Sequence, residues 1–463
     1  MGTVPSIWKK ARIVPVPKSG RSSDPKDYRP ISILCYMALV AERFVAEHLQ
    51  QVTDSELPDF QYGFGRNRGT EDALIMVESA ISEAWNVCAL AGQATRAAVV
   101  SIDTLKAFDT LPHEHIIQSL RGCNGVQPGL VRWFADYLSD RTQCVQVGVA
   151  TSHPIKVRAG VPQGSVVGPL LFNLAMRRMK GINLTRGTSL VQYADDVILI
   201  RALCGTHDQG IMEMDVAKVI DTIESTGLRV NPDKTGYMVA TLDRRDRENT
   251  TSIEVGGATV QASGSLKYLG VTFDKNLSFR THIAIKTRQA RQKLGHLHSV
   301  MRRWRRLRAF QHIYQTCIRP TMTYASVIFS GRQLTGDRML ARVDRIASRM
   351  CTNDYSSEAE VVAARLGWTE LVATARIRRL ATVHAYRLNY RPPPSMVKFK
   401  SARRNTRATY QYQCEPPPPT VREGVAMSCL RRGIKDYNEL PLAVRQMSHM
   451  PSFVKAVTQI HSN

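Results

Sequence analysis

The chain has 463 residues, 43% of them hydrophobic, which excludes disorder throughout because such a composition supports a large core, divided into two or three domains. Lys and Arg total 63 against 39 Asp and Glu, and this net charge of +24 indicates a polyanionic partner held by phosphate contacts. No run of about 18 consecutive apolar residues occurs and MGTVPSIWKK lacks the apolar segment of a signal peptide, so we expect an intracellular protein without a membrane span.

From residue 7 to about residue 279, short apolar runs alternate with longer helical patterns. The runs AAVVSID and SLVQY predict strands, whereas ALIMVESAISEAW and AKVIDTIESTG predict helices. This part of the chain should therefore be a mixed α/β body. The nine cysteines are scattered without C-x-x-C or zinc-type spacing, so we expect reduced thiols with packing roles.

Two acidic motifs lie in this body. VVSIDTLKAFDTLP places Asp103 at the end of a β-branched run, and VQYADDVILI places Asp195 and Asp196 in a hairpin turn between two apolar strands. Carboxylates brought together repel and raise each other's pKa unless a cation lies between them, and Mg²⁺ is the natural cation where phosphate is present. The pattern predicts nucleotidyl transfer with two metal ions. The competing interpretation is that Asp-Asp only forms a turn.

The segment 160–169 is too rich in Gly and Pro for a regular strand. It predicts a loop that enters a helix at about Pro169 and whose backbone can approach a ligand closely.

After residue 279 the chain becomes helical and basic. KTRQARQKLGHLHSVMRRWRRLR, from Lys286 to Arg308, predicts a phosphate-binding helix, with nuclear import as the second reading. A stripe formed by Val343, Ile346 and Met350 predicts plain core, and the proline runs at 392–394 and 416–419 predict linkers.

The motifs IDTLKAFD, GVPQGSVVGPLLF and YADD stand in this order at spacings typical of reverse transcriptases. QYGFGRNRGTEDAL upstream and GLRVNPDKT and LKYLGVTFD downstream extend the similarity, as do DYRPISI and YNELP near the two ends. The chain resembles the polymerase part of non-LTR, LINE-type retrotransposons. No endonuclease, Cys/His knuckle or ribonuclease H signature accompanies it, so we expect a fragment or a truncated copy.

The resemblance implies an α+β, right-hand polymerase fold of fingers, palm and thumb with a mostly helical C-terminal extension. Its boundaries would be 1–279 for fingers and palm, 280–335 for the basic thumb, and 336–463 for the helical C-terminal region with Pro-rich linkers.

The resemblance also implies roles for single residues. Asp103 and Asp195 match the metal ligands and Asp196 the neighbouring acid, with two Mg²⁺ ions, or Mn²⁺ in their place. Lys234 matches a lysine that protonates the departing pyrophosphate, and the LKYLGV hairpin around Tyr268 matches the element that positions the primer terminus. For Lys234, a solvated surface lysine is the alternative.

Five further positions would bind the incoming nucleotide. Phe108 would lie beneath its sugar and exclude a 2′-hydroxyl, Gln163 and Gly164 would line the pocket, and Lys18 and Arg29 would hold the triphosphate. An ordinary core phenylalanine is the alternative for Phe108.

The predicted function is RNA-directed DNA polymerisation, with an RNA template, a DNA primer or target DNA, and deoxynucleotides as partners. We expect a nuclear or cytoplasmic ribonucleoprotein. An inactive nucleic-acid-binding remnant and an intron-type maturase are the alternatives.

Overall fold

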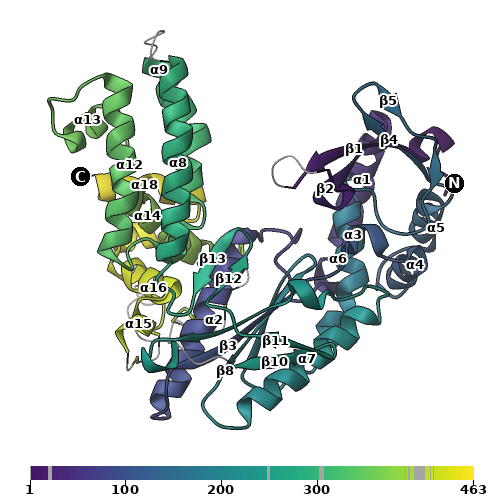
Figure 1. The fold of residues 1–463 in the computed structure, drawn as a ribbon, viewed down its shortest axis with the longest axis horizontal. Helices are drawn as coiled ribbons and strands as arrows, with labels where there is room; N and C mark the ends of the chain where they lie inside the picture. The colour runs from purple at the N-terminus through teal and green to yellow at the C-terminus, as the bar shows by residue number, and fades with distance from the viewer. Residues whose placement is uncertain are drawn as a thin grey trace.

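The computed structural model describes residues 2–18, 23–247, 251–301, 307–391, 393–394, 397–400, 412–417, 419–420 and 422–462. In Figure 1 the described chain forms an open hand: N-terminal strands and helices rise on the right, later helices rise on the left, and a central sheet lies below and between them. The predicted α+β, right-hand fold is confirmed.

The central sheet is antiparallel, with its strands in the order β7 (Thr188–Tyr193), β8 (Asp196–Ala202), β3 (Arg96–Ile102) and β9 (Gly236–Thr241). Successive side chains of a strand point to opposite faces, so the β-branched runs feed two cores. Val99 packs into the core that contains α2 (Thr70–Leu90), whereas Val100 packs into the core that contains α4 (His113–Arg121), α6 (Gly168–Ala175) and α7 (Asp208–Glu224). The strands and helices predicted around these segments are confirmed.

A second sheet, formed mainly by N-terminal strands, lies at the upper right of Figure 1, above the central sheet. Its central strand β1 pairs antiparallel with β2 and parallel with β4. Helices α1, α3 and α5 accompany it. The bounds are β1 (Lys10–Pro17), β2 (Tyr28–Ile33), β4 (Thr142–Val147), β5 (Ala150–Thr151), β6 (Ile155–Lys156), α1 (Tyr36–Thr53), α3 (Ala107–Thr110) and α5 (Pro128–Leu138).

Two hairpins follow the central sheet: β10 (Ser252–Val255) with β11 (Ala258–Gln261), and β12 (Ser265–Tyr268) with β13 (Val271–Asp274). The second hairpin turns through Leu269 and Gly270, whose φ angles are 44° and 79°. Positive φ at both central residues is the type I′ geometry that matches the twist of paired strands. The hairpin predicted from LKYLGV is therefore confirmed.

The rest of the described chain is helical. The helices are α8 (Arg280–Met301), α9 (Leu307–Ile313), α10 (Arg319–Thr323), α11 (Ser326–Phe329), α12 (Leu334–Thr352), α13 (Ala359–Arg365), α14 (Leu371–Arg387), α15 (Glu423–Ala426), α16 (Cys429–Glu439), α17 (Leu442–Arg445) and α18 (Met450–Ser462). One core runs from the central sheet through α2 into these helices, and it includes the predicted stripe at Val343, Ile346 and Met350. The basic residues 302–306 and parts of both proline runs, 392 and 418, lie outside the described residues.

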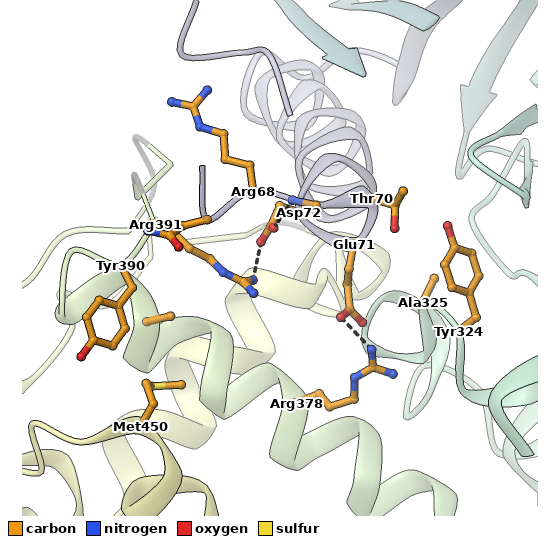
Figure 2. A pocket seen from close by; sticks show the side chains of 13 residues that line it. Arg68, Thr70, Glu71, Asp72, Tyr324, Ala325, Arg378, Tyr390, Arg391 and Met450 are labelled. Carbon is orange, nitrogen blue, oxygen red and sulfur yellow. Dashed lines mark hydrogen bonds and ion pairs between the residues drawn. The ribbon is translucent and has the colours of Figure 1, made fainter. Parts of the chain in front are cut away.

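Helix α2 connects the sheet to the C-terminal helices. Among the described residues it is the one helix long and apolar enough to span a membrane, and 67% of its most apolar window is buried in the protein. Around its N-terminus a cavity of about 600 Å³ is bridged by ion pairs (Figure 2). Arg391 lies 2.5 Å from Asp72, and Arg378 lies 2.9 Å from Glu71. These contacts fix residues after 340 to the helix that supports the sheet.

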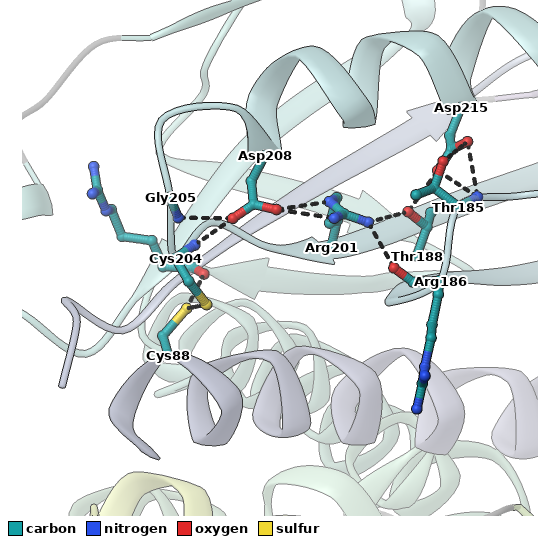
Figure 3. A network of polar contacts seen from close by, with 10 residues as sticks. Cys88, Thr185, Arg186, Thr188, Arg201, Cys204, Gly205, Asp208 and Asp215 are labelled. Carbon is teal, nitrogen blue, oxygen red and sulfur yellow. Dashed lines mark hydrogen bonds and ion pairs between the residues drawn. The ribbon is translucent and has the colours of Figure 1, made fainter. Parts of the chain in front are cut away.

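The far end of the sheet is held by a polar network (Figure 3). Arg201 on β8 donates to Asp208 at 2.9 Å and to Thr188 at 3.1 Å, and Asp208 accepts the backbone N–H of Cys204. The thiol of Cys204 faces that of Cys88 on α2. All nine cysteines are free, and four of them, Cys88, Cys123, Cys414 and Cys429, are buried.

Candidate active site

Three carboxylates lie at one end of the central sheet. Asp103 directly follows β3. The turn between β7 and β8 consists of Ala194 and Asp195, whereas Asp196 is the first residue of β8 and pairs with Tyr193. The prediction that both acids lie in the turn therefore holds for Asp195 alone. Because Ile102 pairs with Val197 across the β3–β8 ladder, the end of β3 lies beside this turn. The structure therefore brings together the two acidic motifs, which are about 90 residues apart in the sequence.

The three carboxylates lie in an environment that disfavours negative charge. Burial raises the pKa of Asp103, against the opposing charges of Lys234 and Lys18. Burial also raises the pKa of Asp195, and the charge of Asp103 adds to the effect. Burial, with the charges of Asp195 and Asp103, raises the pKa of Asp196 to about 7. A cation placed among them would relieve this repulsion.

Residue Lys234 approaches the same carboxylates. Its Nζ lies 3.8 Å from Oδ2 of Asp103, and its side chain is 64% exposed. The segment that carries it is held in place by the backbone, because the N–H of Asn231 donates to the carbonyl of Asp103 at 2.8 Å. Lys234 thus stands between a predicted metal ligand and solvent.

Two of these carboxylates, Asp103 and Asp195, could form part of the shell of a metal ion. Within the described residues, no group of three or more His, Cys, Asp and Glu side chains could hold a metal ion by itself. Magnesium sites commonly use one or two carboxylates, with substrate phosphates and water completing the shell. Asp103 and Asp195 fit that arrangement, because they are two carboxylates at the same end of the sheet, and burial raises the pKa of both.

The loop before α6 contacts the segment that follows Asp103. Gln163 donates from Nε2 to Asp109 at 2.7 Å, and its carbonyl accepts the N–H of Ser32 on β2 at 2.7 Å. Gly164 has φ of 135°, and an added Cβ would lie 2.5 Å from the carbonyl oxygen of Ser32. The predicted loop and the helix that begins at its end are confirmed, and glycine is required for this close approach.

Aromatic rings surround Phe108. Its ring stacks on Phe172 with centroids 4.5 Å apart, and it meets the ring of Phe64 edge-on at 6.1 Å. Phe64 in turn lies 6.3 Å from Tyr193, which precedes the acidic turn. The half-buried Phe108 ring is therefore held by rings from two separate segments, one of which also contacts the residue before the acidic turn.

The two predicted triphosphate ligands lie on the exposed β1–β2 hairpin. Lys18 donates to the carbonyl of Lys26 at 2.8 Å. Burial raises the pKa of Asp103 and of Asp109, and Lys18 is close enough for its charge to oppose both shifts. Arg29 pairs in register with Val16 and is exposed. The structure brings Lys18 toward the acids, whereas no described contact links Arg29 to them.

Sequence reasoning gave no role to single residues of the QYGF segment. The structure places Gln61 and Gly63 against the backbone of Ala194, in the acidic turn, and Phe64 against Phe108. The segment stood out only as part of the family resemblance, because nothing in its local pattern indicates which strand it meets.

A basic surface lies on the opposite side of the hand. Burial, with the charges of Lys267 and Lys293, lowers the pKa of Lys286 on α8. Arg288, Arg291 and Lys293 are exposed on the same helix. Cations that repel one another at a surface favour a polyanion there.

Comparison with known proteins agrees with this geometry. Residues 16–273 match the family model described as reverse transcriptase (RNA-dependent DNA polymerase). A probable RNA-directed DNA polymerase from transposon BS of Drosophila melanogaster is 30% identical over 338 residues, covering 70% of this chain and 36% of that protein. The RNA-directed DNA polymerase from mobile element jockey of Drosophila funebris is 25% identical over 341 residues, covering 71% and 36%.

The chain therefore spans 36% of the length of these two relatives. Among solved structures, apo telomerase from Candida tropicalis is similar at a TM-score of 0.44 and 11% identity, covering 80% of this chain and 63% of that one.

Proposed function

This chain belongs to the reverse transcriptase family, and from that premise we propose that it copies retroelement RNA into DNA by adding deoxynucleotides to a primer 3′-hydroxyl. The observation that carries the proposal is that Asp103, Asp195 and Asp196 lie at the same end of the central sheet. Family membership implies a divalent metal in general. Two Mg²⁺ ions, with Mn²⁺ as an alternative, are part of the proposal.

The acids and Lys234 would carry the chemistry. Two bound Mg²⁺ ions supply the charge that activates the attacking oxygen and stabilises the leaving one. Asp103 and Asp195 would hold them through carboxylate oxygens, and Asp196 adds negative charge beside them. Lys234 holds a proton on Nζ at the exposed side of Asp103, from which it can pass to an oxygen of the departing pyrophosphate.

The nucleotide would bind between the acids and the loop that precedes α6. Phe108, held by Phe172, would lie under the sugar and exclude a 2′-hydroxyl. Gln163 and Gly164 would bound the pocket, and Lys18 and Arg29 would meet the triphosphate as a point charge and a planar fork.

The RNA template and the DNA primer or target DNA would lie across the open hand. The β12–β13 hairpin lies near the acids. Burial is the main cause of the raised pKa of Tyr268 on this hairpin, and the nearby charge of Asp196 is the second cause. Exposed cations on α8 would contact the duplex backbone. A ribonucleoprotein in the nucleus or the cytoplasm would follow from this role.

Primer extension tests the proposal. The purified chain, with Mg²⁺, labelled deoxynucleotides and a primed RNA template, should extend the primer. Asp195→Asn should bind the template equally and extend nothing, whereas Asp221→Asn, the same change at an exposed site on α7, should extend normally. Extension by Asp195→Asn would refute the role of the turn. A wild-type chain that binds without extending would favour the nucleic-acid-binding remnant.

A further inference from the structure

The acidic turn exchanges hydrogen bonds with a side chain 133 residues away. The N–H of Ala194 donates to Oε1 of Gln61 at 3.0 Å, and Nε2 of Gln61 lies 3.5 Å from the carbonyl oxygen of Ala194. The same Oε1 accepts the N–H of Gly63 at 2.7 Å. Gln61 is 1% exposed, so water does not substitute for it.

This contact falls on the strained residue of the turn. Ala194 has φ of 56°, a left-handed conformation that is strained for a residue with a Cβ. Such a conformation persists only where the surroundings determine it. Asp195 follows directly, so the direction of its carboxylate depends on how firmly Ala194 is held.

Backbone contacts fix Gln61 against the turn. The N–H of Tyr62 donates to the carbonyl of Gln192 at 2.8 Å, and the N–H of Gln192 donates to the carbonyl of Phe60 at 2.8 Å. This segment therefore extends the sheet at β7 by one parallel bridge. Arg68 adds a side-chain bond of 2.7 Å from Nη1 to the carbonyl of Gln61.

Glycine at position 63 makes this approach feasible. A Cβ there would lie 2.4 Å from the nitrogen of Ala194, closer than side chains and backbone ever come. Asn173 on α6 donates to the carbonyl of Gly63 at 2.8 Å and closes the other side of the segment. The buried amides of Gln61 and Asn173 and the missing Cβ of Gly63 thus hold this segment against the turn, and the buried amide of Gln192 donates to the Ala194 carbonyl at 2.9 Å from within β7.

We propose that Gln61 is a positioning residue, which holds the Ala194 backbone so that Asp195 presents its carboxylate next to Asp103. The proposal rests on the proposed polymerase function for its kinetic consequences. The positioning itself is a property of the folded chain.

The decisive variant is Gln61→Met, which keeps the length and volume of the side chain and removes its amide. Asn86→Leu is the matched control, because Asn86 is an equally buried amide on α2 that bonds to the carbonyl of Pro419. In Gln61→Met, the N–H of Ala194 should exchange with deuterium at least tenfold faster, while Asn86→Leu leaves that rate unchanged.

Kinetics supply the second readout. Loss of a residue that orients a metal ligand typically lowers metal affinity or activity about 10- to 100-fold. Gln61→Met should lower kcat in this range and raise the Mg²⁺ concentration for half-maximal rate, with the KM for deoxynucleotide and the binding of primed template unchanged. Asn86→Leu should change neither kinetic value.

Unchanged exchange at Ala194 in folded Gln61→Met would overturn the proposal, as would a loss of kcat no greater than that of Asn86→Leu. A wild-type chain without activity would end the polymerase proposal, and amide exchange would then decide the positioning role alone.

Discussion

The ammonium group of Lys234 lies 3.8 Å from the carboxylate of Asp103, while most of the lysine side chain remains exposed. Its charge lowers the pKa of Asp103, which burial raises. Lys234 can therefore act in two separable ways: as a charge that keeps Asp103 ionised for metal binding, and as a proton donor to the leaving group.

Two substitutions should separate these roles. Lys234→Gln removes both, so kcat should fall about 100-fold and the acid limb of the pH–rate profile should move to higher pH. Lys234→Arg keeps the charge on a group that does not release its proton, so kcat should fall while the acid limb stays in place. Single-nucleotide extension measured across pH checks both. A wild-type kcat in Lys234→Arg would argue against proton donation.

Asp196 should make the protein less stable at neutral pH when no divalent metal is present. Burial and the charges of Asp195 and Asp103 raise its pKa to about 7, whereas the unfolded chain ionises near its ordinary value of about 3.9. Between these values the folded state binds the extra proton, so the free energy of unfolding falls as pH rises.

Asp196→Asn removes this penalty. With a chelator present, the Tm of Asp196→Asn should exceed that of wild type at pH 8, and the difference should shrink as the pH falls through 7 toward 4. Asp221→Asn provides the control and should show no such trend. A difference in Tm that stays constant with pH would contradict the assigned cause.

Sugar selection should depend on the Phe108 ring. Because that ring is stacked on Phe172, it cannot easily move aside for a 2′-hydroxyl. Phe108→Val should raise the ratio of kcat/KM for ribonucleotides to that for deoxynucleotides by about tenfold or more. Steady-state incorporation of matched nucleotide pairs measures this ratio. If it stays at the wild-type value, Phe108 is an ordinary core residue.

Gly164 should tolerate no side chain. An added Cβ would lie 2.5 Å from the Ser32 carbonyl oxygen at φ of 135°, so Gly164→Ala should cost about 1–3 kcal/mol and raise the KM for deoxynucleotide. At Gly181 an added Cβ would meet no atom of the described residues within 4 Å, so Gly181→Ala should be close to neutral. Denaturant unfolding and KM of the two variants provide the comparison.

Local sequence patterns were sufficient to predict the strands and the loop that carry the acidic residues and Gly164. The apolar strands around Asp103 and Asp195 follow from periodicity and β-branching, and the loop at Gly164 follows from its composition. The roles of these residues came from the family resemblance and stay predictions. Gln61 could not be found in this way. Local patterns do not indicate that its segment joins the sheet beside Ala194, which lies 133 residues later in the sequence.

The packing of the region after Leu340 could not be predicted from the sequence either. Its helical stripes predicted a core but did not identify the partner of that core. The structure shows one continuous core from the central sheet to α18, with α11, α15 and α16 packed beside α2. The boundaries 1–279, 280–335 and 336–463 stay predictions. Because α2 packs against both the central sheet and the C-terminal helices, we expect these parts of the chain to unfold together.

The buried ion pair between Glu78 and Arg332 should show this shared stability. The Glu78 side chain is 0% exposed and that of Arg332 is 5% exposed, and Glu78 also accepts the N–H of Cys429 at 3.0 Å. Glu78→Gln leaves the guanidinium buried without its counter-charge, a change that costs about 3–5 kcal/mol. Glu439→Gln, in the more exposed pair with Arg376, should cost about 0–1 kcal/mol.

Urea unfolding, followed by the helical signal and by tryptophan emission, should show one transition, and Glu78→Gln should move it to lower urea concentration. Two separate transitions, or equal effects of the two variants, would mean that the C-terminal helices fold independently of the central sheet.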